Sequence, residues 1–326
     1  MAQSLYPLAL SSFFKVVMWG GRKLETTFHR TLPDGHSPVG EAWEVCDRPE
    51  FSGRVLNGPL KDRTLGSLIE EFGPALLGSR VPGSRFPLLV KILDARDRLS
   101  LQVHPDEAAC AKLGGGAEPK TEMWYVMDAD PGAKIVAGVA PDTEPDSFWP
   151  QVNSADIEKQ LHVYEAEAGD VFFIRAGCVH AIGGGNLILE VQQNSDTTYR
   201  ISDWGRVGAD GKPRTLHVEQ ARQCVNFRMA GESRVSRRSG NDGTVPLVRC
   251  PFFQTDEITF SAPLEMPSPG GLSFHLISAV SGSLTLTGGT EPLRIPHGST
   301  VLIPASCGAY TLIPDSGRTV VMKTWI

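Results

Sequence analysis

Four side chains with nitrogen or oxygen donors stand at spacings that could bring them to one metal ion. Gln102 and His104 belong to the stretch SLQVHP, and alternate residues of a strand point to the same face. Glu122, in KTEMWYV, and His180, in GCVHAI, could join them from neighbouring strands. The sequence therefore predicts one divalent cation bound by Gln102, His104, Glu122 and His180 inside a β-barrel.

The surroundings of these donors favour a metal over isolated polar residues. The proline directly after His104 ends its strand, which leaves the histidine at a barrel mouth. Glu122 lies in an apolar run, and burying a carboxylate without a partner is costly, so we expect a cation beside it. Zinc is the first choice for this mixed nitrogen and oxygen set, but iron, manganese, cobalt and nickel also suit it.

Basic residues accompany the predicted site and indicate an anionic substrate. Lys91 stands in an apolar run and Lys120 lies two residues before Glu122. Arg200 could hold a phosphate or an enediolate through its fork of donors, or it could instead pair with Asp196 or Asp203. Lys91 could equally be a side chain whose amine reaches solvent from a strand end.

Composition and turn residues favour a mainly β protein. The chain has 326 residues, 41% hydrophobic, and its 34 glycines and 24 prolines separate short apolar runs. Three helical insertions are expected, at about 60–80, 104–116 and 217–228. Residues 1–235 are predicted to form a metal-binding barrel, and 236–326 a second β domain after a polar linker.

The second block repeats the pattern of the first without its donors. GSTVLIPASCGAYTL echoes GDVFFIRAGCVHAI, with Ala309 in place of His180, and no Gln-x-His precedes it. We therefore expect an internal duplication whose second barrel is degenerate and holds no metal. His275 and His297 are interpreted as surface histidines or histidines satisfied by hydrogen bonds.

Charge and cysteine usage limit the partners and the compartment. A net charge of −6 without a basic stripe argues against nucleic acid or an anionic membrane surface, so we expect a small-molecule ligand. The apolar stretch near Met1 is short and contains a lysine, which is unlike a signal peptide or a membrane span. Six cysteines without a CxxC pair suit reduced thiols, and we predict a cytoplasmic protein.

Ordered motifs along nearly the whole chain resemble those of class I mannose-6-phosphate isomerases of the short bacterial type, in the cupin superfamily. They are WGGRKL (19–24), GEAWEV (40–45), KTEMWYVMDA (120–129), GDVFFIRAGCVHAIG (169–183) and EVQQNSDTTYRISDWGR (190–206).

The resemblance implies two cupin-type jelly-roll barrels and one Zn²⁺ per chain on the four residues named above. It also implies that Arg200 and Asp196 sit in the active site, and that Lys91 and Lys120 are catalytic or substrate-binding. The implied reaction is the reversible conversion of mannose 6-phosphate into fructose 6-phosphate through a cis-enediol. Two alternatives stay open: a sugar-phosphate sensor without turnover, and a cupin oxygenase that uses iron.

Overall fold

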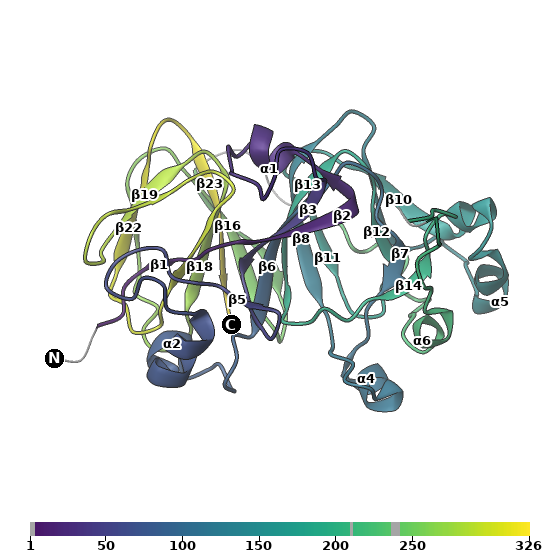
Figure 1. Ribbon diagram of the computed structural model, residues 1–326, viewed down its shortest axis with the longest axis horizontal. Helices are drawn as coiled ribbons and strands as arrows, with labels where there is room; N and C mark the ends of the chain where they lie inside the picture. The colour runs from purple at the N-terminus through teal and green to yellow at the C-terminus, as the bar shows by residue number, and fades with distance from the viewer. Residues whose placement is uncertain (1–3, 209–210, 236–241) are drawn as a thin grey trace. The chain divides into compact units, whose positions relative to one another are not determined.

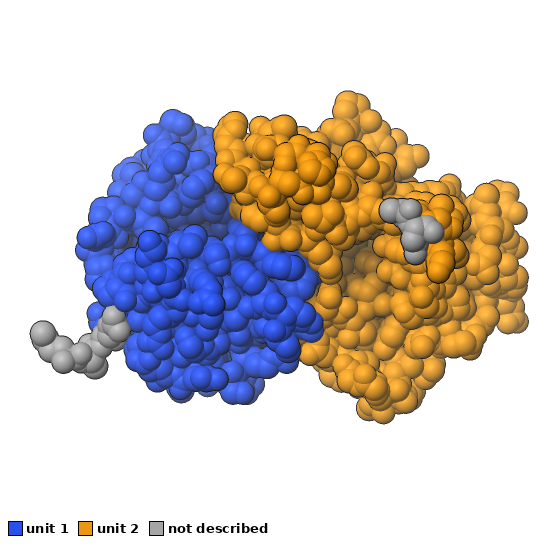
Figure 2. All heavy atoms as spheres, viewed as in Figure 1, with its two compact units in different colours: residues 1–13, 43–91, 237–326 blue, residues 14–42, 92–236 orange. Residues whose placement is uncertain are grey.

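The computed structural model describes residues 4–208, 211–235 and 242–326, and Figure 1 shows that they are mainly β, as predicted. The chain divides into two compact units, coloured in Figure 2. Unit 1 comprises residues 1–13, 43–91 and 237–326, and unit 2 comprises residues 14–42 and 92–236. The predicted metal donors all belong to unit 2.

Unit 2 is built on two sheets. In one sheet the strand order is β10 (Leu161–Glu165), β9 (Lys134–Val139), β12 (His180–Ile182), β7 (Leu101–Val103) and β14 (Tyr199–Ser202). In the other it is β11 (Val171–Ile174), β8 (Glu122–Ala129), β13 (Asn186–Gln193), β6 (Leu88–Ala95), β2 (Phe13–Gly21) and β3 (Val39–Val45). The division between the units falls inside β2, β3 and β6.

The core of unit 2 lies between the facing surfaces of these sheets. Trp124 and Val126 of β8 pack in one buried cluster with Ile135 of β9 and Ile182 of β12. Trp124 and Val126 alternate with residues that point to the other face of β8, so Glu122, two positions earlier, begins the same inward-facing row. The strand thus places a carboxylate at the end of an apolar row.

Short helices cover the outer face of the five-stranded sheet. They are α5 (Pro145–Phe148), α6 (Val218–Arg222) and the 3₁₀ helices η1 (Trp149–Gln151) and η2 (Ala155–Gln160). Phe148, Ile157 and Ala221 from these helices pack on Leu101 and Ile201 of the sheet. Figure 1 shows α5 and α6 beside β7, β12 and β14.

Two further helices lie at the ends of strands in unit 2. One is α1 (Lys23–Thr26), and the other is α4 (Glu107–Leu113), which falls within the predicted insertion 104–116. The side chain of Asp106 accepts a hydrogen bond from the Ala109 amide and so caps α4 three residues after β7. The cap starts the helix just beyond His104, which keeps that histidine at the strand end.

Unit 1 also contains two larger sheets. One has the order β1 (Leu8–Ala9), β21 (Thr300–Ile303), β18 (His275–Ser281), β23 (Thr319–Trp325), β16 (Gln254–Phe260) and β15 (Gly243–Arg249). The other has the order β17 (Leu264–Met266), β22 (Tyr310–Pro314), β19 (Leu284–Thr287) and β20 (Leu293–Ile295), and a small hairpin joins β4 (Asp47–Arg48) to β5 (Phe51–Ser52). Side chains from both sheets form one buried core, which includes Ile277, Leu286 and Leu312.

The predicted insertion at 60–80 forms two helices, α2 (Leu65–Phe72) and α3 (Pro74–Leu77). The Thr64 side chain accepts a hydrogen bond from the Ser67 amide at the start of α2. Gly73, with φ at 45°, separates the helices because it adopts a backbone conformation that other residues avoid.

The grouping of segments in unit 1 differs from the predicted division into 1–235 and 236–326. Strand β1 pairs with β21, and the carbonyls of Leu76 and Leu77 accept hydrogen bonds from the amides of Ala305 and Phe274. Segments 1–13 and 43–91 therefore lie with the C-terminal segment rather than with the metal donors. The domain boundary and the closure of each unit into a jelly-roll barrel stay predictions.

Candidate metal centre

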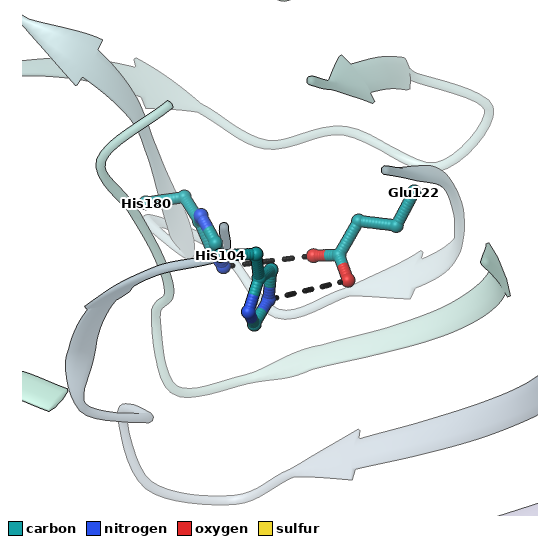
Figure 3. A group of neighbouring side chains, drawn as sticks. All are labelled: His104, Glu122 and His180. Carbon is teal, nitrogen blue, oxygen red and sulfur yellow. Dashed lines mark ion pairs between the residues drawn. The ribbon is translucent and has the colours of Figure 1, made fainter. Parts of the chain in front are cut away.

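Two histidines and one carboxylate converge in the interior of unit 2, as Figure 3 shows. His104 follows β7 directly and His180 begins β12, while Glu122 begins β8 in the facing sheet. The Nε2 atom of His104 lies 3.4 Å from Glu122 Oε2, and the Nε2 atom of His180 lies 3.5 Å from Glu122 Oε1. None of the three residues is more than 1% exposed.

The hydrogen bonds of the two imidazoles fix which ring nitrogen carries the proton. His104 Nδ1 lies 2.9 Å from the Thr197 carbonyl, and His180 Nδ1 lies 2.9 Å from the Cys178 carbonyl. A carbonyl oxygen can only accept, so each Nδ1 donates and each Nε2 presents a lone pair. This is the tautomer in which histidine binds a metal through Nε2.

The consequence is a set of acceptors that face one another. His104 Nε2 and both oxygens of Glu122 are buried without a well-aligned hydrogen bond within the described chain, and Oε2 has the Lys120 ammonium as an ion-pair neighbour at 3.0 Å. The imidazole Nε2 atoms and the carboxylate oxygens are all acceptors, and at 3.4 to 3.5 Å they repel one another unless a cation lies between them. The three donors therefore fit a divalent metal ion.

Gln102 completes the predicted donor set. It pairs directly with His180 across β7 and β12, so the two side chains share one face of the sheet. Its Nε2 atom lies 3.1 Å from His180 Nε2. A half-turn about the last side-chain torsion would present the amide oxygen at the same place, and oxygen is the atom that binds a cation.

Burial and one lysine set the charges of the cluster. Burial first, and then the nearby cation of Lys120, lowers the pKa of His104 to about 3, and burial lowers the pKa of His180. Burial by itself raises the pKa of Glu122, but the Lys120 ammonium, 3.0 Å from Oε2, helps to hold that pKa well below its usual range. All three donors are thus in their metal-binding forms at neutral pH.

Arg200 stands next to the cluster without a carboxylate partner. It pairs with Gln102 across β14 and β7, and its Nη1 donates to the Thr215 carbonyl at 2.7 Å. Among the described residues it forms no ion pair, and its Nε is buried without an acceptor. Asp203, one of the two predicted alternatives as its partner, is instead bound by Arg206 and Arg214.

Lys91 and Asp196 are the remaining predicted site residues. Lys91 is buried on β6, with its Nζ 5.4 Å from the centre of the Trp43 ring. Asp196 directly precedes Thr197, and its carboxylate lies 3.8 Å from the Lys15 amine. Their roles in catalysis stay predictions.

Two polar residues of β13 escaped the sequence analysis. Glu190 is buried and accepts a hydrogen bond from Trp124 Nε1 at 3.0 Å, and Gln192 pairs directly with Glu122. Both lie in NLILEVQQ, where polar residues at alternate positions interrupt an apolar strand. That alternation is the signal that could have identified them.

The histidines of unit 1 are hydrogen-bonded, in agreement with the interpretation from the sequence. His275 is buried, and its Nδ1 lies 3.0 Å from the Tyr310 hydroxyl. His297 Nε2 lies 3.1 Å from the Val280 carbonyl.

Comparison with known proteins assigns the chain to a family. Residues 8–133 match the family described as phosphomannose isomerase type I, catalytic domain. The mannose-6-phosphate isomerase of Streptococcus mutans is 35% identical over 311 residues, which span 95% of this chain and 96% of that protein. The chain belongs to the mannose-6-phosphate isomerase family. The probable mannose-6-phosphate isomerase GmuF of Bacillus subtilis is 33% identical over 94% of this chain and 96% of its own length.

The fold agrees with membership of this family. The crystal structure of the mannose 6-phosphate isomerase from Bacillus subtilis superposes with a TM-score of 0.83 at 29% identity, covering 99% of this chain and all of that one. The resemblance inferred from the ordered motifs is thereby confirmed. None of the helices in the described part of the chain has the length and apolarity needed to cross a membrane.

Proposed function

We propose that this chain is a mannose-6-phosphate isomerase, which converts D-mannose 6-phosphate reversibly into D-fructose 6-phosphate. The observation that carries the proposal is the buried group of His104, Glu122 and His180, whose lone pairs face one another. Relatives that share this family over nearly the whole chain bear the name of that activity. A small hexose phosphate is the proposed partner, and the cytoplasm is the proposed compartment.

The proposed cofactor is one Zn²⁺ held by Gln102, His104, Glu122 and His180. Mixed imidazole and oxygen donors suit zinc, and the same set would accept other divalent ions. When bound, the ion would supply Lewis-acid polarisation of the oxygens on C1 and C2 of the open-chain sugar. The Glu122 carboxylate and the two neutral imidazoles leave that centre with net positive charge, which favours an anionic substrate.

Isomerisation moves a proton between C2 and C1, so the site needs a group that can carry it. Lys120 is the proposed carrier: as the neutral amine it would take the proton from one carbon, and as the ammonium it would return that proton to the other. Its Nζ lies 3.0 Å from the Glu122 carboxylate, and the residue is only 4% exposed. A proton carrier must be held within hydrogen-bond reach of the proton that it moves, and the contact with Glu122 fixes the amine beside the metal donors. Lys91 and Asp196 are proposed as further catalytic or substrate-binding residues.

Arg200 is the proposed binding group for negative charge on the substrate. Arg200 is half-buried, and a phosphate or enediolate oxygen would satisfy its buried Nε donor, which lacks an acceptor within the described chain. Burial, followed by the charge of Arg214, lowers the pKa of Arg200, although the Asp203 carboxylate acts in the opposite direction. Its place opposite Gln102 puts it on the same sheet face as the metal donors.

A coupled assay for fructose 6-phosphate tests the proposal. Purified protein would be measured as isolated, after removal of metal by a chelator, and after zinc is restored. We expect turnover that is lost on stripping and regained with zinc. Absence of turnover in a sample shown to contain metal would refute the activity and favour a sugar-phosphate sensor.

A further inference from the structure

Gln192 is fully buried beside the metal donors. It pairs directly with Glu122 across β13 and β8, and direct partners in an antiparallel pair have side chains on the same face. The inward row that contains Glu122 and Trp124 therefore has Gln192 as its neighbour. Its amide lies on the face of the sheet that carries the Glu122 carboxylate.

The orientation of the Gln192 amide is fixed by its nitrogen. Nε2 donates to the Ser195 carbonyl at 2.5 Å and to the Gln193 carbonyl at 2.9 Å. Both partners can only accept, so the amide cannot exchange its two ends without losing both bonds. The amide oxygen, Oε1, therefore points away from the Gln193 and Ser195 carbonyls.

That oxygen has no donor within the described chain. Gln192 Oε1 is buried, without a hydrogen-bond partner, in a residue with no exposed surface. A buried acceptor left unpaired is rare, because its desolvation is not compensated. Glu122 and His104 lack protons to donate, and the Lys120 ammonium pairs with Glu122 without bonding to Gln192 Oε1, so we look for the donor in a bound molecule.

We propose that Gln192 Oε1 accepts a hydrogen bond from a non-reacting hydroxyl of the bound hexose phosphate, at C3 or C4. This inference rests on the proposed function. The oxygens on C1 and C2 take part in the proton transfer and C6 carries the phosphate, which leaves these two hydroxyls to report the configuration of the sugar. Gln192 is then a substrate-positioning residue that contributes to specificity.

The nitrogen of the same amide gives Gln192 a second, structural connection. The loop that it binds, residues 193–197, accepts a hydrogen bond from the Thr121 amide through Gln193 Oε1 at 2.8 Å. It also holds His104 through the Thr197 carbonyl. A substitution at Gln192 therefore disturbs the loop as well as the oxygen, and the test has to separate the two effects.

The test combines protein variants with deoxy sugars. kcat/KM would be measured for mannose 6-phosphate and its 3-deoxy and 4-deoxy analogues in the parent and in Gln192→Met. Gln193→Met is the matched control, because it loosens the same loop but does not remove the unpaired oxygen. Metal content of each protein, by atomic emission, reports loop damage independently of turnover.

We expect the parent to lose roughly 10- to 100-fold in kcat/KM on one deoxy analogue, the range for an unsatisfied buried acceptor. In Gln192→Met this ratio of parent-sugar to deoxy-sugar kcat/KM should fall to about 3-fold or less, whereas Gln193→Met should retain most of it. Loss of activity from loop damage lowers kcat/KM for all three sugars together and leaves the ratio unchanged.

Two results would overturn the assignment of Gln192. One is a parent enzyme that converts mannose 6-phosphate and both deoxy analogues equally well. This comparison uses the parent alone, so it tests the assignment even if Gln192→Met does not fold. The other is a deoxy penalty in Gln192→Met equal to that of the parent. A parent that does not convert mannose 6-phosphate at all refutes the proposed function instead, so the two failures are distinguishable.

Discussion

Replacement of His275 by glutamine should remove a defined part of the acid sensitivity of this protein. His275 is 6% exposed in unit 1, and its pKa is lowered to about 3, first by burial and then by Lys323. The unfolded chain binds a proton at this histidine below about pH 6.5, whereas the folded chain does not until about pH 3. The stability that neutral His275 provides is therefore complete above about pH 6.5 and decreases as the pH falls towards 3.

The magnitude follows from the separation of the two pKa values. Between about pH 6.5 and about pH 5 the unfolded state gains about 1.36 kcal/mol per pH unit from this proton, or about 2 kcal/mol in all. The parent should thus lose about 2 kcal/mol more than His275→Gln between about pH 7.5 and about pH 5. Glutamine can still bond to the Tyr310 hydroxyl, so the variant changes titration more than packing.

Urea unfolding of chelator-treated protein, followed by tryptophan fluorescence at both pH values, measures this difference. His36→Gln is the matched control, because it makes the same substitution at a side chain that is 88% exposed. The free energies of unfolding are compared between proteins, so contributions of all other groups cancel. Equal losses in the parent and in His275→Gln, within about 0.5 kcal/mol, would refute the reasoning.

Three further predictions concern the candidate site. Glu122→Gln should abolish metal binding and leave the Lys120 ammonium buried without a counter-charge, at a cost of about 3–5 kcal/mol; metal analysis and urea unfolding check both effects, and metal content equal to the parent's would contradict the ligand assignment. Lys120→Met should retain the metal but lower kcat by roughly 10²- to 10⁴-fold, and a kcat within about tenfold of the parent's would exclude Lys120 as proton carrier. Arg200→Lys should raise KM for mannose 6-phosphate about tenfold, because lysine lacks the planar fork; steady-state kinetics measure this, and an unchanged KM would argue against phosphate binding by Arg200.

Local patterns were enough to predict several strands of unit 2. The stretch EMWYVMDA forms β8, Glu122–Ala129, and Gln102 lies on β7 with His104 directly after that strand. The roles of these residues as metal ligands stay predictions. The direct pairing of His180 with Gln102 is not visible in the sequence, because register between distant strands depends on tertiary packing. The prediction that the segments of Gln102 and His180 meet therefore depended on the family resemblance of their motifs, and not on residue spacing alone.

The contacts that could not be predicted from the sequence join residues that are not neighbours along the chain. Asp203 was weighed as a partner of Arg200, yet it binds Arg206 and Arg214, since the loop after β14 folds back on the strand end. The pairing of β1 with β21 likewise joins the two ends of the chain, and no local preference encodes it. Gln192 stayed unnoticed because a neutral amide in a strand gives no chemical signal until its partners are known.

The metal donors are contributed by two facing sheets and by segments far apart in the chain, and this has a consequence for the order of events during folding. A growing chain on the ribosome presents His104 and Glu122 well before His180 and before Thr197, whose carbonyl orients the first histidine. Contacts of such sequence separation form late, because closing long loops costs entropy. We therefore expect the proposed metal ion to enter a nearly finished protein, so that the rate of metal uptake during refolding would report when the two sheets of unit 2 have closed.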